Sequence, residues 1–477
     1  MLADTDATHQ LAAAIHADDA KAITQLLNNR PDLKSKLNDP LPTEAFGSTA
    51  LLAVVGRGKP DVIDALLDAG ADPNARSHWW AGSFGVLDTC DPALAPHLIR
   101  RGATLNAHAA AHLGMFDKLK ELIAANPALV HSRGGDGQTP LHFASTVEIA
   151  QFLLDQGADI NARCVDHEST PAQWMIKDRQ PVVRFLVDHG CETDILMAAA
   201  LGDLTLVGKH LESDPSSIRM CVSDEFFPKK NPKAASIIYV WTLGSNKTPH
   251  RVARDFGHED VYRYLMEQSP PEVQLVTALA VGDEPTARAL LAAHPNLPQS
   301  LTSLDASHLP AAARDNNAAA VKLMVEWGFP VNARGMHGGT ALHWAAWHGN
   351  AQIVRQILPH NPDLEDSANE FHASPLRWAL HGSQNSWHRQ TGDYPAAVEA
   401  LLEAGANPPK LSPDTKATEP VLATLARFAQ KISPPLPPQP DHSMFDEEPR
   451  GEDETPTDIH NPRAKRHPRK EGRDGTP

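Results

Sequence analysis

Histidine is the residue type that most strongly suggests chemistry in this sequence, because 25 of its 477 residues are histidines. Imidazole groups bind transition metals and transfer protons near neutral pH. The histidines are scattered along the chain, however, and no His-Glu-x-x-His motif occurs. His343 and His348 are five residues apart, a spacing that places them on different faces of a helix. The pattern therefore predicts no metal site.

The other sequence motifs of catalysis and cofactor binding are missing too. The chain contains no Gly-x-Gly-x-x-Gly, no Gly-x-x-x-x-Gly-Lys-Ser/Thr and no Gly-x-Ser-x-Gly. The cysteines are scattered rather than paired as Cys-x-x-Cys, which argues against a zinc knuckle or a disulfide framework and favours a reducing compartment, the cytoplasm; they are Cys90, Cys164, Cys191 and Cys221. We therefore predict no enzyme, no catalytic residue and no cofactor.

Segment 338–358 shows which elements would position any functional side chain. Thr340 is a good N-cap, and the apolar residues that follow it have helical spacing. Gly349 permits a sharp turn, after which a second apolar stripe begins at Ile353. The two predicted helices are too short to be stable alone in water, so each must pack against another such unit.

Copies of this segment recur along the chain. The most complete copy, Thr139-Pro140-Leu141-His142, is accompanied by variants that begin at Thr49, Thr170 and Thr248. The glycines that close the second helices keep a constant spacing, since Gly70 and Gly102 are 32 residues apart and Gly157 and Gly190 are 33 apart. The sequence is therefore built from one repeating unit of two helices.

A 33-residue period with Thr-Pro-Leu-His resembles the ankyrin repeat family, in particular long arrays of the bacterial type. The resemblance covers residues 10–410 in about twelve units, several of them degenerate. It implies an all-α solenoid of helix-turn-helix units with β-turn fingers. It also implies that the chain binds a protein partner through the concave face, which the fingers and first helices form, and catalyses no reaction.

The family pattern gives individual residues structural roles. Prolines at the first helical position cost no hydrogen bond, and the closing glycines suit left-handed helix caps. In the family the motif histidine bonds between neighbouring repeats, a role that the resemblance gives to His142 and His343. Other residues replace the histidine in some repeats, where we expect weaker joints; these are Leu52, Gln173, Arg251 and Arg377.

Four further segments depart from the repeat. Residues 1–9 are predicted to be a polar lead, and 411–432 a capping segment after the array. Inserts are expected near 216–247, which contains a strand-like apolar run at Ile237–Trp241, and at 381–393 between two helices. The repeat that begins at Gly137 is about three residues short, which should tighten its helix turn.

Residues 433–477 are rich in proline and charge and are predicted to be a disordered tail. Its basic segment Arg463–Lys470 fits either a nuclear localisation or nucleic-acid patch or, as we favour, a solvated tail.

The net charge of −16 repels phosphate and predicts a partner with a basic patch rather than nucleic acid. No apolar run approaches the ~20 residues of a membrane span, and Met1–Asp6 does not resemble a signal peptide. We expect a monomer without a membrane segment.

The aromatic residues fall into two groups by repeat position. Phe143, Trp174, Trp344 and Trp378 follow the motif histidine or its equivalent, and the family packs this position between repeats. Trp347 and His348 precede the helix turn, where the family varies its sequence to contact ligands, so they are expected to be exposed at a partner surface; the fingers add Trp79, Trp80, Met336, His337 and Phe371.

Three alternatives stay open at the level of sequence. Trp347 could instead be buried beneath the 381–393 insert and contribute to stability. The Trp- and His-rich insert 381–394 could bind a small molecule or a metal. The chain could also be a secreted effector that acts inside a host cell, for which no residue pattern is specific.

Overall fold

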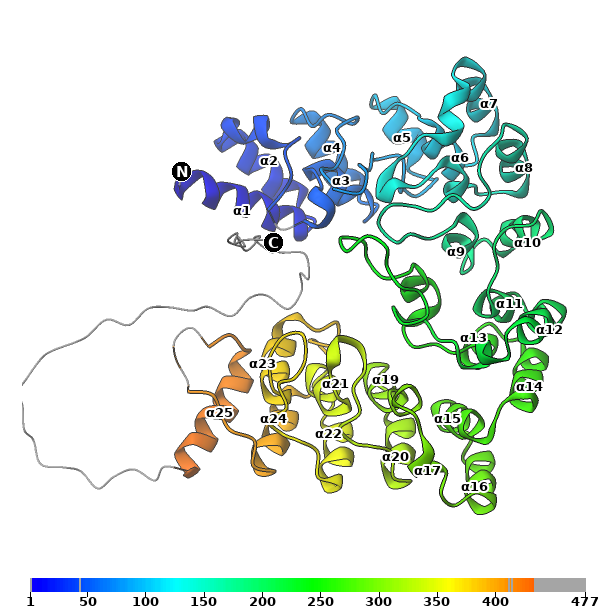
Figure 1. Cartoon of the computed structure of the whole chain (residues 1–477). Coiled ribbons are helices and arrows are strands. Elements are labelled where there is room, and N and C mark those ends of the chain that lie inside the picture. The colour runs from blue at the N-terminus through cyan, green and yellow to red at the C-terminus, as the bar shows by residue number, and fades with distance from the viewer. Residues whose placement is uncertain (1, 43, 411, 413–414, 433–477) are drawn as a thin grey trace, which may run out of the picture. The chain divides into compact units, whose positions relative to one another are not determined.

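The computed structural model describes residues 2–42, 44–410, 412 and 415–432 (Figure 1). These residues form short helices and contain no β-strand. The chain divides into two compact units, here called unit 1 (1–265) and unit 2 (266–477). The predicted tail at 433–477 lies outside the described residues.

Unit 1 consists of successive helix pairs joined by turns and fingers. Its α-helices, and its 3₁₀- and π-helices labelled η, are α1 (Leu2–His16), α2 (Ala20–Asn29), η1 (Pro31–Lys36), η2 (Ala45–Gly47), α3 (Ala50–Val55), α4 (Pro60–Asp68), α5 (Ala95–Arg100), α6 (Ala107–His112), α7 (Phe116–Ala125), η3 (Pro127–His131), η4 (Gly135–Gly137), η5 (Pro140–Phe143), α8 (Val147–Asp155), α9 (Pro171–Met175), α10 (Gln180–Asp188), α11 (Ile195–Leu201), α12 (Leu204–Ser213), η6 (Pro215–Arg219), η7 (Val240–Gly244), α13 (Pro249–Asp255) and α14 (Glu259–Gln268), which extends into the start of unit 2.

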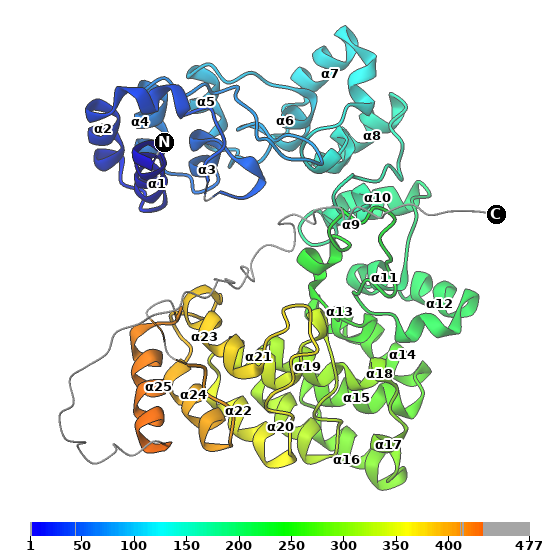
Figure 2. The same ribbon diagram turned by 60° about the vertical axis from the view of Figure 1, so that its left-hand side comes forward.

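Unit 2 continues the same construction. Figure 2 shows its first helices, α19, α21 and α23, side by side in one row, and its second helices, α20, α22 and α24, in another; neighbours in each row are in contact. The helices are α15 (Pro271–Val281), α16 (Glu284–Ala293), α17 (Leu297–Ser300), α18 (Ser303–Ala306), α19 (His308–Arg314), α20 (Ala318–Glu326), η8 (Met336–Gly338), α21 (Ala341–Trp347), α22 (Ala351–Ile357), η9 (Leu358–His360), α23 (Pro375–Asn385), α24 (Tyr394–Glu403) and α25 (Glu419–Ile432).

The helix caps confirm the sequence pattern. The hydroxyls of Thr49, Thr170 and Thr248 accept backbone N–H groups at the starts of α3, α9 and α13. A proline occupies the first turn of η5, α9 and α13, and the closing glycines have positive φ angles, as left-handed caps require.

The motif histidines join neighbouring repeats as expected. Nδ1 of His142 accepts the N–H of Thr139 at 3.1 Å, so Nε2 carries the proton and donates to the carbonyl of Ser169 in the next repeat at 3.1 Å. Burial lowers the pKa of His142 to about 3. At the equivalent position Gln173 accepts the N–H of Thr170 at 3.0 Å, so an amide partly replaces the imidazole.

The packing of the core follows from the repeat as well. Trp344, Trp378 and Phe143 are buried, while Trp174 is partly buried and donates its indole N–H to the sulfur of Cys164.

All four cysteines are buried free thiols, and burial raises the pKa of Cys90 to about 11 and that of Cys191 to about 12. Burial and a raised pKa both disfavour the reactive thiolate form of these cysteines.

Three expected segments differ in the structure. Residues 2–9 are the first part of α1, not a separate lead. The run Ile237–Trp241 forms no strand, because its backbone has no partner strand; its first three side chains are buried and π-helical η7 begins at Val240. Part of the insert 381–393 is helical, since α23 continues to Asn385 before a loop leads to α24.

Two further segments that the sequence singled out are described by the structure. The short repeat after Gly137 reduces its first helix to the single turn η5. Residues 419–432 form α25, which packs against α24 and so covers the last repeat of unit 2. The described residues thus give each unit a core between its two rows of helices.

Candidate functional site

Trp347 and His348 are not exposed, which corrects the sequence-based expectation. Trp347 keeps 4% of its surface accessible and His348 keeps 1%. His348 donates from Nε2 to the carbonyl of Arg314 at 2.8 Å, and burial lowers its pKa to about 4. Both residues are therefore parts of the core of unit 2, and neither presents a side chain to a partner.

Residues of the 381–393 insert cover the side chains of Trp347 and His348. His381 stacks on Trp347 with ring centroids 5.6 Å apart, and Trp387 meets the same ring edge-on at 6.3 Å. Trp387 and His388 also lie against His348, at 5.2 and 4.8 Å. We call Trp344, Trp347, Trp378 and Trp387 the tryptophan cluster; only Trp387, 56% exposed, presents much surface.

Two fingers border this cluster. The ring of His337 lies 5.4 Å from Phe371 and 6.2 Å from Trp344, and Phe371 lies 5.5 Å from Trp378. His337, Phe371 and Met336 are all partly buried. The structure thus brings together the three finger residues of unit 2 that the sequence singled out, and it places them beside packed tryptophans.

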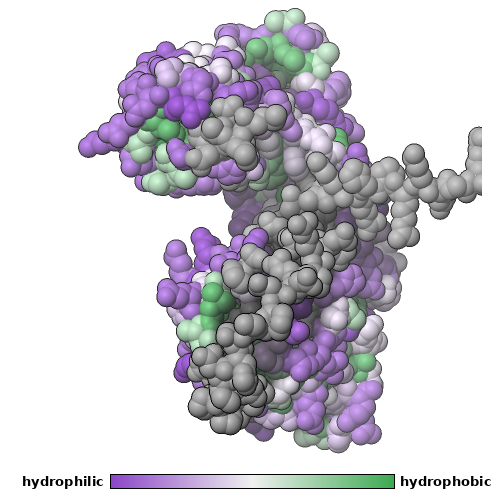
Figure 3. Space-filling model, turned by 90° about the vertical axis from the view of Figure 1, so that its left-hand side faces the viewer, coloured by the Kyte–Doolittle hydropathy of each residue, from purple (hydrophilic) through white to green (hydrophobic). Residues whose placement is uncertain are grey.

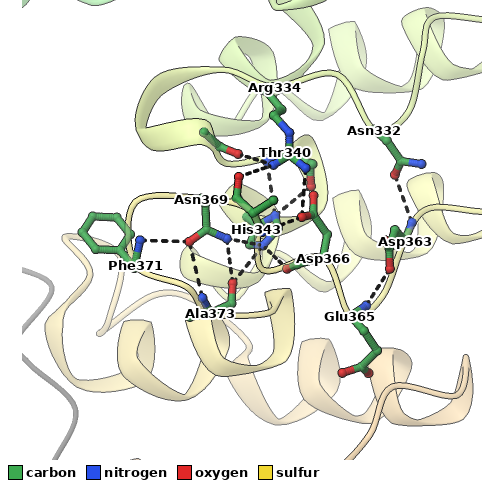
Figure 4. A network of polar contacts seen from close by, with 12 residues as sticks. Asn332, Arg334, Thr340, His343, Asp363, Glu365, Asp366, Asn369, Phe371 and Ala373 are labelled. Atoms are coloured by element: carbon green, nitrogen blue, oxygen red, sulfur yellow. Dashed lines mark hydrogen bonds and ion pairs between the residues drawn. The ribbon is translucent and has the colours of Figure 1, made fainter.

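A polar network fixes these fingers (Figure 4). His343 contacts the carbonyls of Asp366 and Ala373 through Nε2 at 3.0 and 3.1 Å, and Asn369 accepts the N–H of Phe371 at 3.1 Å. Arg334 binds the carboxylate of Asp366 at 3.0 Å. Burial raises the pKa of this carboxyl group, but the N–H of Ala368 and the guanidinium outweigh that effect and lower it overall. The finger backbone is therefore held in one conformation.

Unit 1 contains a second group of aromatic residues, which is exposed. Phe46 lies 4.9 Å from Trp79 and 5.9 Å from Phe84, and Trp79 lies 6.1 Å from Trp80. We call Phe46, Trp79, Trp80 and Phe84 the finger cluster. Phe46 is 46% exposed and Trp80 is 39% exposed, whereas Trp79 and Phe84 are partly buried. The predicted pair Trp79 and Trp80 therefore belongs to a surface that two neighbouring fingers form.

The finger cluster is rigidly supported. Arg76 binds the buried carboxylate of Asp88 at 2.9 Å and donates to the hydroxyl of Ser83 at 2.9 Å, which ties finger 76–85 to its own base. Phe46 has a left-handed backbone (φ 60°), a conformation that a phenylalanine keeps only when its surroundings enforce it.

The next finger packs directly on this one. A side chain at Gly135 would overlap the ring of Phe84, and one at Gly82 would overlap the carbonyl oxygen of Gly134. Glycine is therefore required at these two positions for the fingers to stack, and their close contact holds the aromatic rings in place.

Few aromatic side chains are exposed in the part of the chain that the structure describes. The face drawn in Figure 3 is mostly hydrophilic, with hydrophobic residues in separate areas. Among the described residues, the large hydrophobic side chains that are exposed are Phe46, Trp80, Val147, Val165, Leu204, Trp241 and Trp387. Within this set Phe46 and Trp80 come from adjacent fingers and belong to the same aromatic cluster, whereas the tryptophan cluster contributes Trp387 alone.

Comparison with known families decides the architecture. The family model described as "Ankyrin repeats (3 copies)" matches residues 107–215, 275–368 and 309–412, and the model "Ankyrin repeat" matches 46–78. These matches cover more than half of the chain. The chain belongs to the ankyrin repeat family. Together with the helices described above, these matches confirm the all-α solenoid predicted from the repeats. Ankyrin repeats generally mediate protein–protein interaction and are typically not enzymatic.

Curated relatives match short parts of the chain. It is 32% identical over 90 residues to palmitoyltransferase Hip14 of Drosophila melanogaster, which is 19% of this chain and 13% of that protein. It is 32% identical over 83 residues to serine/threonine-protein kinase VIK of Arabidopsis thaliana (17% and 19%) and 24% identical over 144 residues to alpha-latrocrustotoxin-Lt1a of Latrodectus tredecimguttatus (30% and 8%). The chain spans less than a fifth of the length of each relative.

Ankyrin repeats indicate protein partners for this chain. The described part of the chain contains no helix of the length and apolar character that crossing a membrane requires.

Sequence reasoning missed Phe46, Phe84 and Trp387 as surface aromatics. The sequence did contain a signal for Phe46, which lies three residues before the N-cap Thr49. His337 lies at the same finger-tip position, three residues before Thr340.

Proposed function

We propose that this protein binds another protein through the finger cluster of unit 1. The observation that carries the proposal is the joint exposure of Phe46 and Trp80 on two adjacent fingers that are already rigid. Large aromatic side chains held in their bound conformation lose little entropy on binding and commonly dominate the binding energy of an interface. Trp79 contacts both of these rings, and Phe84 contacts Phe46.

The partner's chemistry follows from shape and charge. An apolar side chain of the partner would pack on the exposed rings, and basic residues around it would complement the net charge of −16. We further propose that the protein acts as a cytoplasmic monomer, a setting that suits its four reduced thiols. The fingers of Met336, His337 and Phe371 are the second candidate surface, supported by the partial exposure of these residues in unit 2.

The test compares the proteins that the full-length wild type and its variants retain in a pull-down. Trp80→Ala should lose the proteins that the wild type retains, with a drop in affinity of about thirtyfold, equivalent to ~2 kcal/mol. Trp241→Ala is the matched control, because Trp241 is 71% exposed in the same unit but is not a member of the finger cluster. Equal retention by all three proteins would contradict the proposal, and loss only in a Phe371→Ala variant would favour the fingers of unit 2.

A further inference from the structure

Three potential metal ligands meet at the finger tips of unit 1. One ligand atom each of Asp136, Asp166 and His167 lies within 4.8 Å of the other two. The three residues are 7%, 2% and 8% exposed. Asp136 comes from one finger, while Asp166 and His167 come from the finger one repeat later, so only the stacking of the fingers brings the three side chains together.

His167 is oriented as a ligand. Its Nδ1 lies 2.7 Å from the carbonyl oxygen of Ser236, and a carbonyl can only accept, so Nδ1 carries the proton. In the neutral ring Nε2 then holds a lone pair, and this atom lies 3.6 Å from Oδ2 of Asp166, beyond hydrogen-bonding distance. A lone pair that faces a carboxylate in a buried site is an arrangement that a bound cation would complete. Histidine ligands characteristically donate their second nitrogen to a carbonyl or carboxylate in this way.

The backbone fixes the same geometry. Asp136 has a left-handed conformation (φ 54°), and its carbonyl accepts the N–H groups of Val165 at 2.7 Å and Asp166 at 3.1 Å. The indole N–H of Trp79 donates to Oδ1 of Asp136 at 2.8 Å, which orients that carboxylate. Ala235 donates to the carbonyl of Asp166 at 2.7 Å. The ligand atoms are thus held in place by their neighbours, which reduces the entropy that binding an ion would cost.

We propose that Asp136, Asp166 and His167 bind one divalent transition-metal ion, with Zn²⁺ the best fit. Two carboxylates buried this close repel each other, and a divalent cation offsets that repulsion. A donor set of one imidazole and two carboxylates suits zinc, whereas calcium and magnesium favour oxygen ligands. The ion would tie two consecutive fingers together, and through Ser236 it would also fix the segment between η6 and η7.

The test is calorimetric titration of chelator-treated full-length protein with ZnCl₂. We expect one Zn²⁺ per chain, and at least a tenfold loss of affinity in His167→Gln and in Asp166→Asn. His97→Gln is the matched control, because it removes an imidazole that lies 2.9 Å from a single carboxylate, that of Asp64, and should bind as the wild type does. Absence of saturable binding by the wild type, or equal binding by all four proteins, would overturn the proposal.

Thermal unfolding with and without ZnCl₂ gives a second readout. Zinc should raise the melting temperature of the wild type and of His97→Gln, because a ligand bound only by the folded state stabilises it, and should leave Asp166→Asn unchanged. Asp166→Asn is nearly isosteric and replaces His167→Gln if that variant fails to fold; an equal zinc shift in Asp166→Asn contradicts the site. The inference does not depend on the proposed partner surface, since zinc binding is measured without any partner protein.

Discussion

The tryptophan cluster of unit 2 and the finger cluster of unit 1 are built from the same kinds of residue, yet one is covered and the other is open. In unit 2, residues after α23 place Trp387 and His388 over Trp347 and His348. In unit 1 the comparable insert is 216–247, and it attaches to a different finger. The N–H groups of its residues Lys230 and Asn231 donate to the carboxylate of Glu168 at 2.7 and 2.9 Å.

The destination of each insert therefore decides which aromatic residues meet solvent. The unit 1 insert is attached to finger 163–169 and leaves Phe46 and Trp80 uncovered. The unit 2 insert folds onto the inner helix α21 and converts a position that ankyrin repeats vary for recognition into core. Clustered aromatic residues can thus contribute to stability in one unit and remain exposed in the other.

The largest expected effect separates the two clusters by stability. Trp347→Ala should lower the free energy of unfolding by ~3–5 kcal/mol, because it removes a buried ring from between α21 and the insert. Trp80→Ala should change it by less than about 1 kcal/mol, since the ring is already 39% exposed. Urea denaturation of both variants measures the difference, and equal losses would mean that the two clusters do not differ in the way described.

A second change tests how closely the covered cluster is packed. Gly382→Ala should lower stability by about 1–3 kcal/mol, because the new Cβ would overlap the carbonyl oxygen of Trp347 and force α23 away from α21. Gly208→Ala in α12 is the control. Its Cβ would meet only the hydroxyl of Tyr264 at an ordinary 3.6 Å, so it should raise stability by ~0.5–1 kcal/mol. A Gly382→Ala protein as stable as the wild type would show that the two helices separate easily.

The smallest expected effect is on pH dependence. The pKa of His348 is lowered from 6.5 to about 4, so between these pH values the unfolded chain binds a proton that the folded chain does not. Stability must therefore fall as the pH decreases through this range, by roughly 1–2 kcal/mol at pH 5. His348→Gln should lose that part of the pH dependence, whereas Trp80→Ala should keep it. Parallel curves of unfolding free energy against pH for wild type and His348→Gln would refute the assignment.

The sequence by itself determined the repeat and its joints, because these depend on local chemistry. N-cap threonines, first-turn prolines and closing glycines act within a few residues, and His142 and His343 reach only the next repeat. Such interactions recur with the period of the chain, so their pattern is visible without coordinates. The burial of Trp344 and Trp378 followed from the same periodicity.

Only the tertiary structure decided which surfaces stay open and which side chains meet. Trp347 and His348 are buried because an irregular insert folds back over them, and no periodic pattern specifies where an insert goes. Asp136 and His167 meet because consecutive fingers stack tip to tip, a contact set by glycines and turns rather than by any motif spacing. The scaffold is therefore encoded locally, whereas the exposed aromatic cluster and the ligand cluster arise from packing between segments distant in the chain.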